Sequence, residues 1–526
     1  MTENTRQPLR SDLVLPNQRN SGVVRNMLLI TIAIYVMTIF TADPRRLEIA
    51  YVEFIFQLLS WAIVTTVAIQ RLPNRSIRIS DYLVFMSFWE LLYFILPSIA
   101  WLQGNPSQWS KFIDINDQIA SRVFIAHGLF MLAFSVGFIS LKPATNYSNT
   151  IDNSERIPPG WPLFLFSIII SLIIQITIRY YVTGSLAKSS YGDWSRGFVD
   201  LTMNLQGGRG GSYFLFQLYA QFYFMITLLM GAGIGLILAR SINNRLDAIR
   251  NVLLLGFFLL LFYLLGSGAR DEIIVPILIG LVFVDMVVYK IPIRWYMIVF
   301  MFVGLVLLDF LATYRQYSDD PISVALPMAI EKYTEPGTTR FSEFSLMLDK
   351  EMVSAQIFGE YHQNTSQYLT NMALGWVPSQ IFPDKISYVR TDEILARYVF
   401  GDKNYLNSGL AGTMIGEGFR LAKDRLLGVL FLAFLVGLMI GGVDSILLGS
   451  DITHKTILHV LLHAGLVSTS YRIIRSSPSD IISNVFYDIL IPSIVFTVLM
   501  LRRPTFWNTP IHWLTGVSNQ IRSGRL

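Results

Sequence analysis

The sequence predicts an all-α polytopic membrane protein of about twelve transmembrane helices with a large external loop subdomain. Of the 526 residues, 53% are hydrophobic and only 15% are charged, whereas soluble proteins carry about a quarter charged residues. The mean hydropathy is +0.49, and the apolar residues gather in runs of about 20, the length that crosses ~30 Å of hydrocarbon. This composition excludes an ordinary soluble enzyme.

Twelve apolar windows, separated by polar interruptions, are the expected spans. They lie near 24–42, 49–70, 81–102, 119–141, 161–182, 212–239, 247–265, 272–289, 295–313, 425–443, 455–471 and 481–501. The first window follows Arg19 and Arg25, has full spanning length and lacks a small-residue cleavage site. It is therefore expected to remain as a transmembrane helix and not to be removed as a signal peptide.

The spans divide the chain into five parts. These are a cytoplasmic tail 1–23, helices one to nine in 24–313 with an external loop 183–211, an external helical lid subdomain 314–424, helices ten to twelve in 425–501, and a cytoplasmic tail 502–526. Lys and Arg are more frequent in the segments on the same side of the membrane as the amino terminus than in the short loops on the other side. This bias predicts that both termini are cytoplasmic. The reverse orientation stays open, because Arg45, Arg46, Arg472 and Arg475 lie on the opposite side.

The long external segment contains two expected helices. In the first, 339–360, the residues Phe341, Phe344, Leu348 and Met352 recur at helical spacing, with Glu343, Asp349, Lys350 and Glu351 elsewhere around the wheel. This amphipathic helix is expected either to lie on the lipid surface or to roof a cavity. The second is a short helix over 391–400, with Thr391 as its N-cap and Gly401 at its far end.

Arginines stand at the outer ends of several expected spans. They are Arg270, Arg315, Arg472 and Arg475, and Arg209 lies in the glycine-rich external loop. Guanidinium groups are always charged and bind paired oxygens, so arginines that converge on one outward-facing cavity suit a pyrophosphate better than a neutral sugar. The alternative is that each one snorkels to the lipid surface or pairs with a local acid, as Arg270 can with Asp271.

Four segments stand out near the expected outer ends of the later spans and in the long external segment. They are GSGAR at 266–270, WVPSQIFPDK at 376–385, SGLAGTMIGEGF at 408–419 and YRIIRSSPSDI at 471–481. Together they resemble Wzy-type polymerases, the bacterial membrane enzymes that polymerise O-antigen and related oligosaccharide repeat units. The resemblance covers the number of spans, the long external loop and about the last 260 residues. This sequence departs from the family in having GEGF where a glutamate followed by an aromatic residue is common, and in the length of 183–211.

The resemblance implies a GT-C-like glycosyltransferase of the bacterial inner membrane. Such an enzyme moves a growing glycan from undecaprenyl pyrophosphate onto the sugar of an incoming lipid-linked repeat unit, on the periplasmic face. For this reaction we expect catalytic roles for Arg270, Arg475 and Glu417, which lie in the resembling segments. The chemistry and position of further polar residues predict a substrate-binding group made of Arg209, Arg315, Arg472, Arg340, Glu343, His362 and Lys385. The partners implied are the lipid-linked oligosaccharide, membrane lipid and a regulator of chain length; no cofactor, metal or nucleic acid is expected.

A base is needed only if the acceptor hydroxyl loses its proton as it attacks. The candidates are Glu417, Glu343, Glu360, His362 and Asp271. Glu417 ranks first because its segment lies between the external subdomain and the tenth span. Its alternative role is structural, as a capping residue or as a salt-bridge partner of Arg420 at i+3.

Other polar residues fall inside the expected spans. Glu90, His127, Asp285 and Asp309 would suit a proton relay in a transporter, although Asp285 can also pair with Lys290. His459 and His463 lie one helical turn apart, with His454 before them, a spacing compatible with metal ligation. Hydrogen bonds between helices explain the two span histidines without a metal.

Two further functions remain alternatives. A lipid-linked oligosaccharide flippase or another secondary transporter would show matched internal repeats and charges buried in its spans, and no repeat is evident in the sequence. An O-antigen ligase of similar architecture would transfer the finished glycan to a different acceptor.

Overall fold

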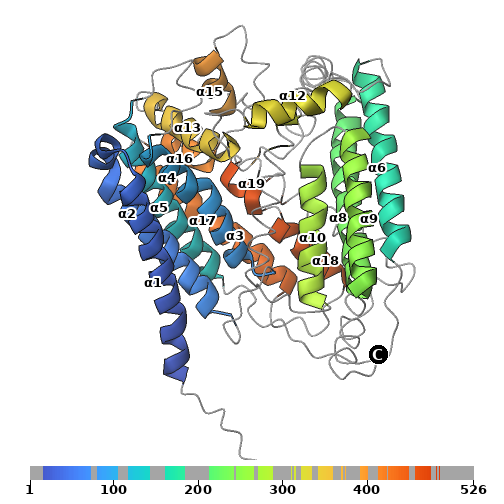
Figure 1. The fold of residues 1–526 in the computed structure, drawn as a ribbon, viewed down its shortest axis with the longest axis horizontal. Helices are drawn as coiled ribbons and strands as arrows, with labels where there is room; N and C mark the ends of the chain where they lie inside the picture. Colours follow the sequence, from blue (N-terminus) through green and yellow to red (C-terminus); the bar gives the residue numbers. More distant parts are fainter. Residues whose placement is uncertain are drawn as a thin grey trace, which may run out of the picture.

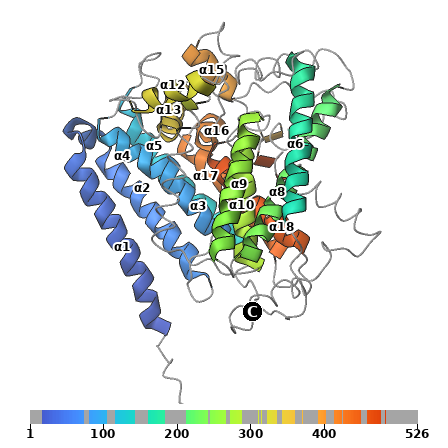
Figure 2. The same cartoon turned by 45° about the vertical axis from the view of Figure 1, so that its right-hand side comes forward.

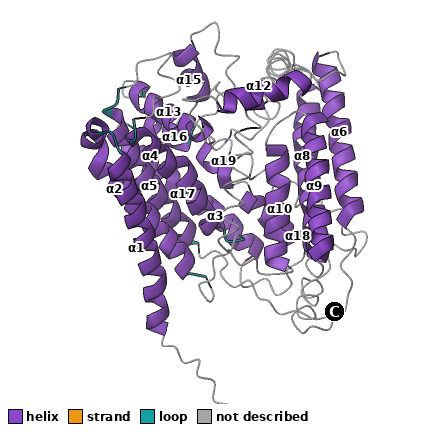
Figure 3. Cartoon of the chain, viewed as in Figure 1, coloured by secondary structure: helices purple, strands orange, loops and turns teal. Residues whose placement is uncertain are grey.

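The computed structural model describes most of the helical parts of the chain. The described residues are 16–72, 80–104, 116–141, 160–183, 212–241, 245–265, 271–287, 322–334, 342–358, 391–400, 413–422, 425–448, 457–468 and 470–475, with a few short pieces at 310, 313–314, 369–370, 374, 481–482 and 485. The regular secondary structure of the described residues is entirely helical, with no β-strand (Figure 3). The all-α fold class is therefore confirmed for the described residues.

One group of helices is built from the first third of the chain and one later helix. Its members are α1 (Pro16–Thr41), α2 (Pro44–Gln70), α3 (Tyr82–Glu90), the π-helix η2 (Leu91–Ile95), α4 (Leu96–Leu102), α5 (Ile119–Ser140) and α17 (Arg425–Leu448). Asp43 and Asp81 cap α2 and α3, where their carboxylates accept backbone N–H groups. α5 lies at the centre of this group, in contact with α2 on one side and α17 on the other.

A second group lies beside the first (Figures 1 and 2). It contains α6 (Gly160–Thr183), α8 (Ser212–Ser241), α9 (Arg245–Leu265) and α10 (Asp271–Val287), with α8 packed against α6, α9 and α10. α18 (Ile457–Ser468) contacts α8 and α10 of this group and also α3 and α17 of the first. The carboxyl-terminal part of the chain therefore joins the two groups.

Eight described helices are long and apolar enough to cross a membrane. They are Gly22–Thr41, Pro44–Gln70, Tyr82–Leu102, Ile119–Ser140, Gly160–Thr177, Tyr223–Ser241, Leu246–Tyr263 and Arg425–Leu447. Each coincides with an expected span. α10 and α18 are apolar helices of 17 and 12 residues at two further expected positions, whereas most of 295–313 and 481–501 lies outside the described residues. The chain is thus a multi-pass membrane protein, and twelve spans remain a prediction.

Glycines allow close helix packing in the first group. A Cβ at Gly437 or Gly441 of α17 would overlap the carbonyl oxygen of Phe134 or Phe138 on α5, and a Cβ at Gly137 of α5 would overlap the carbonyl oxygen of Phe434. Gly437 and Gly441 form a GxxxG pair, which lets two backbones touch where lipid provides no hydrophobic drive for association. The sequence places small residues where α5 and α17 meet.

Four helices of the expected external segment lie at the end of the molecule opposite the start of α1 (Figure 1). They are α12 (Ile322–Thr334), α13 (Ser342–Ile357), α15 (Thr391–Phe400) and α16 (Met414–Leu421). The helix expected over 391–400 is confirmed with the same bounds, although Thr391 is its first helical residue and not its N-cap.

α13 corrects one expectation about this segment. The helix expected within 339–360 is present, but it does not lie on the lipid surface. Its polar residues Asp349, Lys350 and Glu351 are buried together with the apolar Leu348 and Met352, and the helix packs against α4, η2, α5 and α16. The amphipathic pattern did not reveal this because the helix is covered on several sides, by polar and apolar neighbours alike.

Candidate functional site

α16 holds the one predicted catalytic residue whose side chain the structure describes, Glu417. Thr413 caps the helix, since its side-chain oxygen accepts the Gly416 N–H at 2.9 Å. All eight residues of α16 are buried, and Glu417 is 1% exposed. A carboxyl group in such a position is costly unless it has polar company, which makes it a candidate for a chemical role.

The glycines on either side of Glu417 explain how α16 is held. A Cβ at Gly416 would overlap the Ser354 hydroxyl of α13, and a Cβ at Gly418 would overlap the backbone of Val429 on α17. The GEGF sequence therefore fits a space between two other helices. At Gly418 a larger side chain would therefore collide with α17.

α16 also contacts α19 (Ser470–Arg475). Two of the four segments that carry the family resemblance, GEGF and YRIIR, are thus neighbours, although more than fifty residues separate them in the sequence. α19 lies against α3 as well, and Arg472 on it is partly exposed. α19 is labelled between the two helix groups in Figure 1.

The remaining predicted site residues are described only in part or not at all. The helical backbone is described at Glu343 in α13 and at Arg475 in α19, without their side chains. Outside the described residues lie Arg209, Arg270, Arg315, Arg340, Glu360, His362 and Lys385. Convergence of the arginines on one chamber therefore stays a prediction.

The predicted alternative for Glu417, a salt bridge to Arg420, also stays a prediction. Arg420 is buried like Glu417, and its guanidinium carbon lies 5.9 Å from the centre of the Phe358 ring at the end of α13. This places the arginine within the distance of a cation–π contact. Arg420 therefore helps to join α16 to α13.

A buried polar centre joins α13 to the membrane helices. His127 of α5 and Glu351 of α13 are both fully buried, and the His127 Nε2 lies 2.5 Å from the Glu351 Oε2. On the other side of the ring, the Gln57 Nε2 of α2 lies 2.7 Å from the His127 Nδ1. Phe94 of η2 stacks on the ring at 4.3 Å between centroids.

The hydrogen bonds around His127 define its tautomer. If the Gln57 amide donates to Nδ1, then Nε2 carries the proton and donates it to the Glu351 carboxylate. His127 was expected as part of a transporter relay. In this structure His127 anchors α13, and no sequence pattern indicated its partner because Glu351 is more than 200 positions away.

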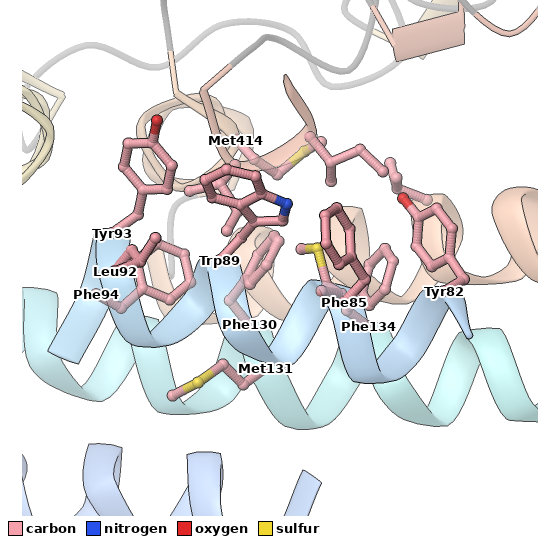
Figure 4. Packing of buried hydrophobic residues seen from close by; sticks show 14 of the residues in the cluster. Tyr82, Phe85, Trp89, Leu92, Tyr93, Phe94, Phe130, Met131, Phe134 and Met414 are labelled. Atoms are coloured by element: carbon pink, nitrogen blue, oxygen red, sulfur yellow. The ribbon is translucent and has the colours of Figure 1, made fainter. Parts of the chain in front are cut away.

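Glu90, another expected relay member, lies at the junction of α3 and η2. It is fully buried, and neither of its carboxyl oxygens has a hydrogen-bond partner among the described residues. Figure 4 shows the aromatic side chains of α3 and η2 in a row beside Phe130 and Phe134 of α5 and Met414 of α16. π-helical turns are frequent at functional positions in proteins.

A second polar centre lies at the opposite end of α3, where the two helix groups meet. The Asp285 Oδ2 of α10 accepts the Ser80 hydroxyl at 2.5 Å and the Ser80 N–H at 3.2 Å. The His463 Nε2 of α18 donates to the Ser80 carbonyl oxygen at 2.8 Å. The expected partner of Asp285, Lys290, is outside the described residues. His463 does form a hydrogen bond, but its partner is the turn before α3 and not another helix.

Asp81 follows Ser80 and forms an ion pair with Arg71, with 2.5 Å between the Asp81 Oδ2 and the arginine nitrogen. Burial raises the pKa of Asp81, and the Arg71 charge and the Val84 N–H act against this rise. The Arg71 guanidinium also lies over the Phe138 ring, 5.1 Å from its centre. This pair holds Asp81 in place next to Ser80, which contacts α10 and α18.

The comparisons with known proteins add no relative. No family model, curated protein or solved structure matches this chain. Among the described residues, no group of three or more His, Asp or Glu side chains is arranged to hold a metal ion. The candidate site therefore rests on geometry and on the sequence motifs.

Proposed function

We propose that the protein is a membrane glycosyltransferase that polymerises oligosaccharide repeat units carried on undecaprenyl pyrophosphate. The observation that supports this most is the contact between α16 and α19, because it joins Glu417 to the segment of Arg472 and Arg475. α16 lies toward the end of the molecule that carries α12, α13 and α15, whereas α19 lies nearer the middle, between the two helix groups (Figure 1). In our proposal that end faces the periplasm.

The chemistry assigns different work to the two helices. The leaving group is already a pyrophosphate, so the enzyme mainly has to bind it and neutralise its charge where little water is present. Arg472 and Arg475, with Arg270 and Arg315, would do this as fixed forked donors. Glu417 would accept the proton of the acceptor hydroxyl as the new glycosidic bond forms.

Reconstitution with defined substrate tests the proposal. Purified protein is supplied with lipid-linked repeat units and the products are separated on a gel. A ladder supports polymerisation, whereas a single shifted band that appears only with an added lipid acceptor would support the ligase instead. Absence of any covalent product from folded protein would contradict both.

Two substitutions connect the assay to the residues. Glu417→Gln and Arg475→Ala are each expected to lower ladder formation by roughly a hundredfold or more, while the protein remains folded and monodisperse. Arg250→Ala is the matched control, because Arg250 is 65% exposed on α9 and pairs with a neighbour on its own helix. Full activity of Glu417→Gln would exclude the glutamate as the base.

A transporter of lipid-linked oligosaccharide is the second candidate, and one observation favours it. Ionisable side chains are buried in described membrane helices at Glu90, His127, Asp285, Asp444 and His463. Such groups in membrane segments commonly mark ion or substrate pathways. Translocation of a fluorescent lipid-linked glycan across proteoliposomes, without a covalent product, would favour this candidate over the polymerase.

A further inference from the structure

The contact between His463 and Asp444 bears on the protonation of the His463 ring and the Asp444 carboxyl group. The His463 Nδ1 of α18 is 2.9 Å from the Asp444 Oδ1 of α17, and the two side chains are 0% and 1% exposed. The contact is not aligned as a hydrogen bond, and Asp444 Oδ1 has no hydrogen-bond partner among the described residues. It is therefore a close electrostatic contact between two buried polar atoms.

The protonation of the ring can be deduced from its other nitrogen. A backbone carbonyl oxygen only accepts hydrogen bonds, so the His463 Nε2 that faces the Ser80 carbonyl must carry a proton. In a neutral ring the Nδ1 is then an acceptor with a lone pair. An ionised carboxylate is also only an acceptor, so the two atoms would repel each other at 2.9 Å.

We propose that His463 and Asp444 form a buried binding site for one proton, held between the His463 Nδ1 and the Asp444 Oδ1. The proton comes from solvent and forms either an N–H bond, which gives an imidazolium beside a carboxylate, or an O–H bond, which gives a neutral acid beside a neutral ring. In both forms one atom donates and the other accepts. The inference does not depend on the proposed glycosyltransfer.

The surrounding charges favour an added proton at this place. Asp285 of α10 and His463 both bind Ser80, Asp285 through its hydroxyl and His463 through its carbonyl oxygen. Asp81 lies close enough to Asp444 for their charges to interact. Among the described residues, Arg71 is the guanidinium that pairs with this cluster, and it binds Asp81. A proton on the His463–Asp444 pair therefore reduces the repulsion between Asp444 and Asp81.

The position of the pair makes this proton relevant to the architecture. α18 contacts α8 and α10 in one helix group and α17 and α3 in the other. Loss of the shared proton would place repulsion at the contact between α17 and α18, which belongs to the joint between the two groups. A proton that bridges this joint is a suitable point for coupling between them.

Spectroscopy on the purified full-length protein tests the proposal. The chain has 6 histidines, so ¹⁵N NMR of histidine-labelled protein at pH 8 resolves few rings, and His463→Gln assigns the signal while keeping a donor toward Ser80. At this pH an ordinary histidine, with a pKa of about 6.5, is mostly neutral. Infrared spectra of the same samples show whether a protonated carboxyl band is lost in Asp444→Asn.

Two results would support the site. Either the His463 ring is protonated on both nitrogens and becomes neutral in Asp444→Asn, or Asp444→Asn removes one protonated carboxyl band while the Nδ1 signal of the parent protein shows an accepted hydrogen bond. The amide introduced by Asp444→Asn supplies its own N–H to the ring, so this variant keeps the contact without the shared proton. Asp247→Asn is the matched control, because the Asp247 side chain is 42% exposed.

The opposite result is equally clear. If the parent protein at pH 8 has a His463 ring with a bare Nδ1 and the infrared spectrum of Asp444→Asn shows no lost carboxyl band, the site does not exist. Should Asp444→Asn fail to fold, the spectrum of the parent protein assigned through His463→Gln still decides the ring form. A ring with protons on both nitrogens supports the proposal, and a ring without any proton or accepted hydrogen bond at Nδ1 overturns it.

Discussion

His127 is engaged at both ring nitrogens and packed between aromatic rings. Gln57 and Glu351 occupy the two nitrogens, while Phe94 and Phe124 stack on the ring. Each of these contacts is buried, so water cannot replace a lost partner. Removing only one polar partner here should therefore lower the free energy of unfolding by more than the intact pair adds to it relative to two apolar side chains.

Glu351→Leu should therefore destabilise the protein by about 3 kcal/mol, because it leaves the His127 Nε2–H buried without an acceptor. The double variant His127→Leu with Glu351→Leu should recover most of this loss, since both polar partners are then gone. Thermal unfolding followed by size-exclusion chromatography in detergent measures the order of the variants. Asp247→Ala on the exposed surface of α9 is the control, and Glu351→Leu as stable as the parent protein would contradict a structural pair.

At the scale of helices, glycines let the backbones of α5 and α17 approach closely. The two backbones touch at Gly137, Gly437 and Gly441, so any side chain there has to push the helices apart. Lipid competes for apolar surfaces inside a membrane, and close backbone contact is one of the few ways to favour helix association.

Gly437→Val should separate α5 from α17 and lower the yield of folded protein severely, at a cost of about 3 kcal/mol or more. Gly256→Ala on α9 is the matched control, because no atom lies within 4 Å of a Cβ placed there, and an alanine is about 1 kcal/mol more favourable in a helix. Fluorescence-detected size-exclusion chromatography compares the two. Equal yields from both variants would show that the glycines are not needed for the contact.

The helices α12 and α13 differ in how they are covered by the rest of the protein. α13 is buried among α4, α5 and α16, and the Arg425 side chain donates to the Ala355 carbonyl oxygen near its end at 2.6 Å. α12 instead packs through Ala325 and Ala329, and it exposes Val324, Leu326, Met328 and Ile330. α12 is thus the better candidate for a helix that lies on the membrane surface.

Hydrogen–deuterium exchange measured by mass spectrometry should distinguish the two helices. We expect peptides from α13 to exchange as slowly as those from α5, because opening α13 requires breaking the His127–Glu351 pair. α12 peptides should exchange roughly tenfold faster or more in detergent, since fewer buried contacts hold that helix. Fast exchange throughout α13 would mean that its packing is not stable in solution.

At the scale of the whole molecule, the described helices form two groups that are joined by α18, with four shorter helices toward one end (Figure 2). The start of α1 and the end of α8 lie at the other end (Figure 1). If the amino terminus is cytoplasmic, α12, α13 and α15 lie on the outer side of the membrane.

The absence of cysteine makes this orientation easy to test. A single cysteine at the exposed position Asp117, beside the start of α5, should react with an impermeant maleimide in intact cells. One at Arg240, exposed near the end of α8, should react only after permeabilisation. The inverse pattern would show that the orientation is reversed and that the proposed site faces the cytoplasm.

Much of the fold was predictable because each membrane helix is determined locally. A run of about 20 apolar residues has to form a helix in lipid, where no water can satisfy the backbone, and eight described helices occur at expected spans. The short helix at 391–400 was predictable for a related reason, since its first-turn acids and its end are local signals. The change from α3 into the π-helix η2 was not predicted, although Pro97 follows η2 by two residues and offers no N–H to the carbonyl of Tyr93 inside it.

The sequence by itself determined the membrane class, most of the helix positions and the prominence of Glu417. Only the tertiary structure showed that α13 is buried through Glu351 and His127 and that α16 contacts α19. Only the tertiary structure placed Asp444 of α17 beside His463 of α18. The physical reason is that the length of an apolar segment is a local property of the sequence, whereas the partner of a buried polar group depends on how distant helices pack.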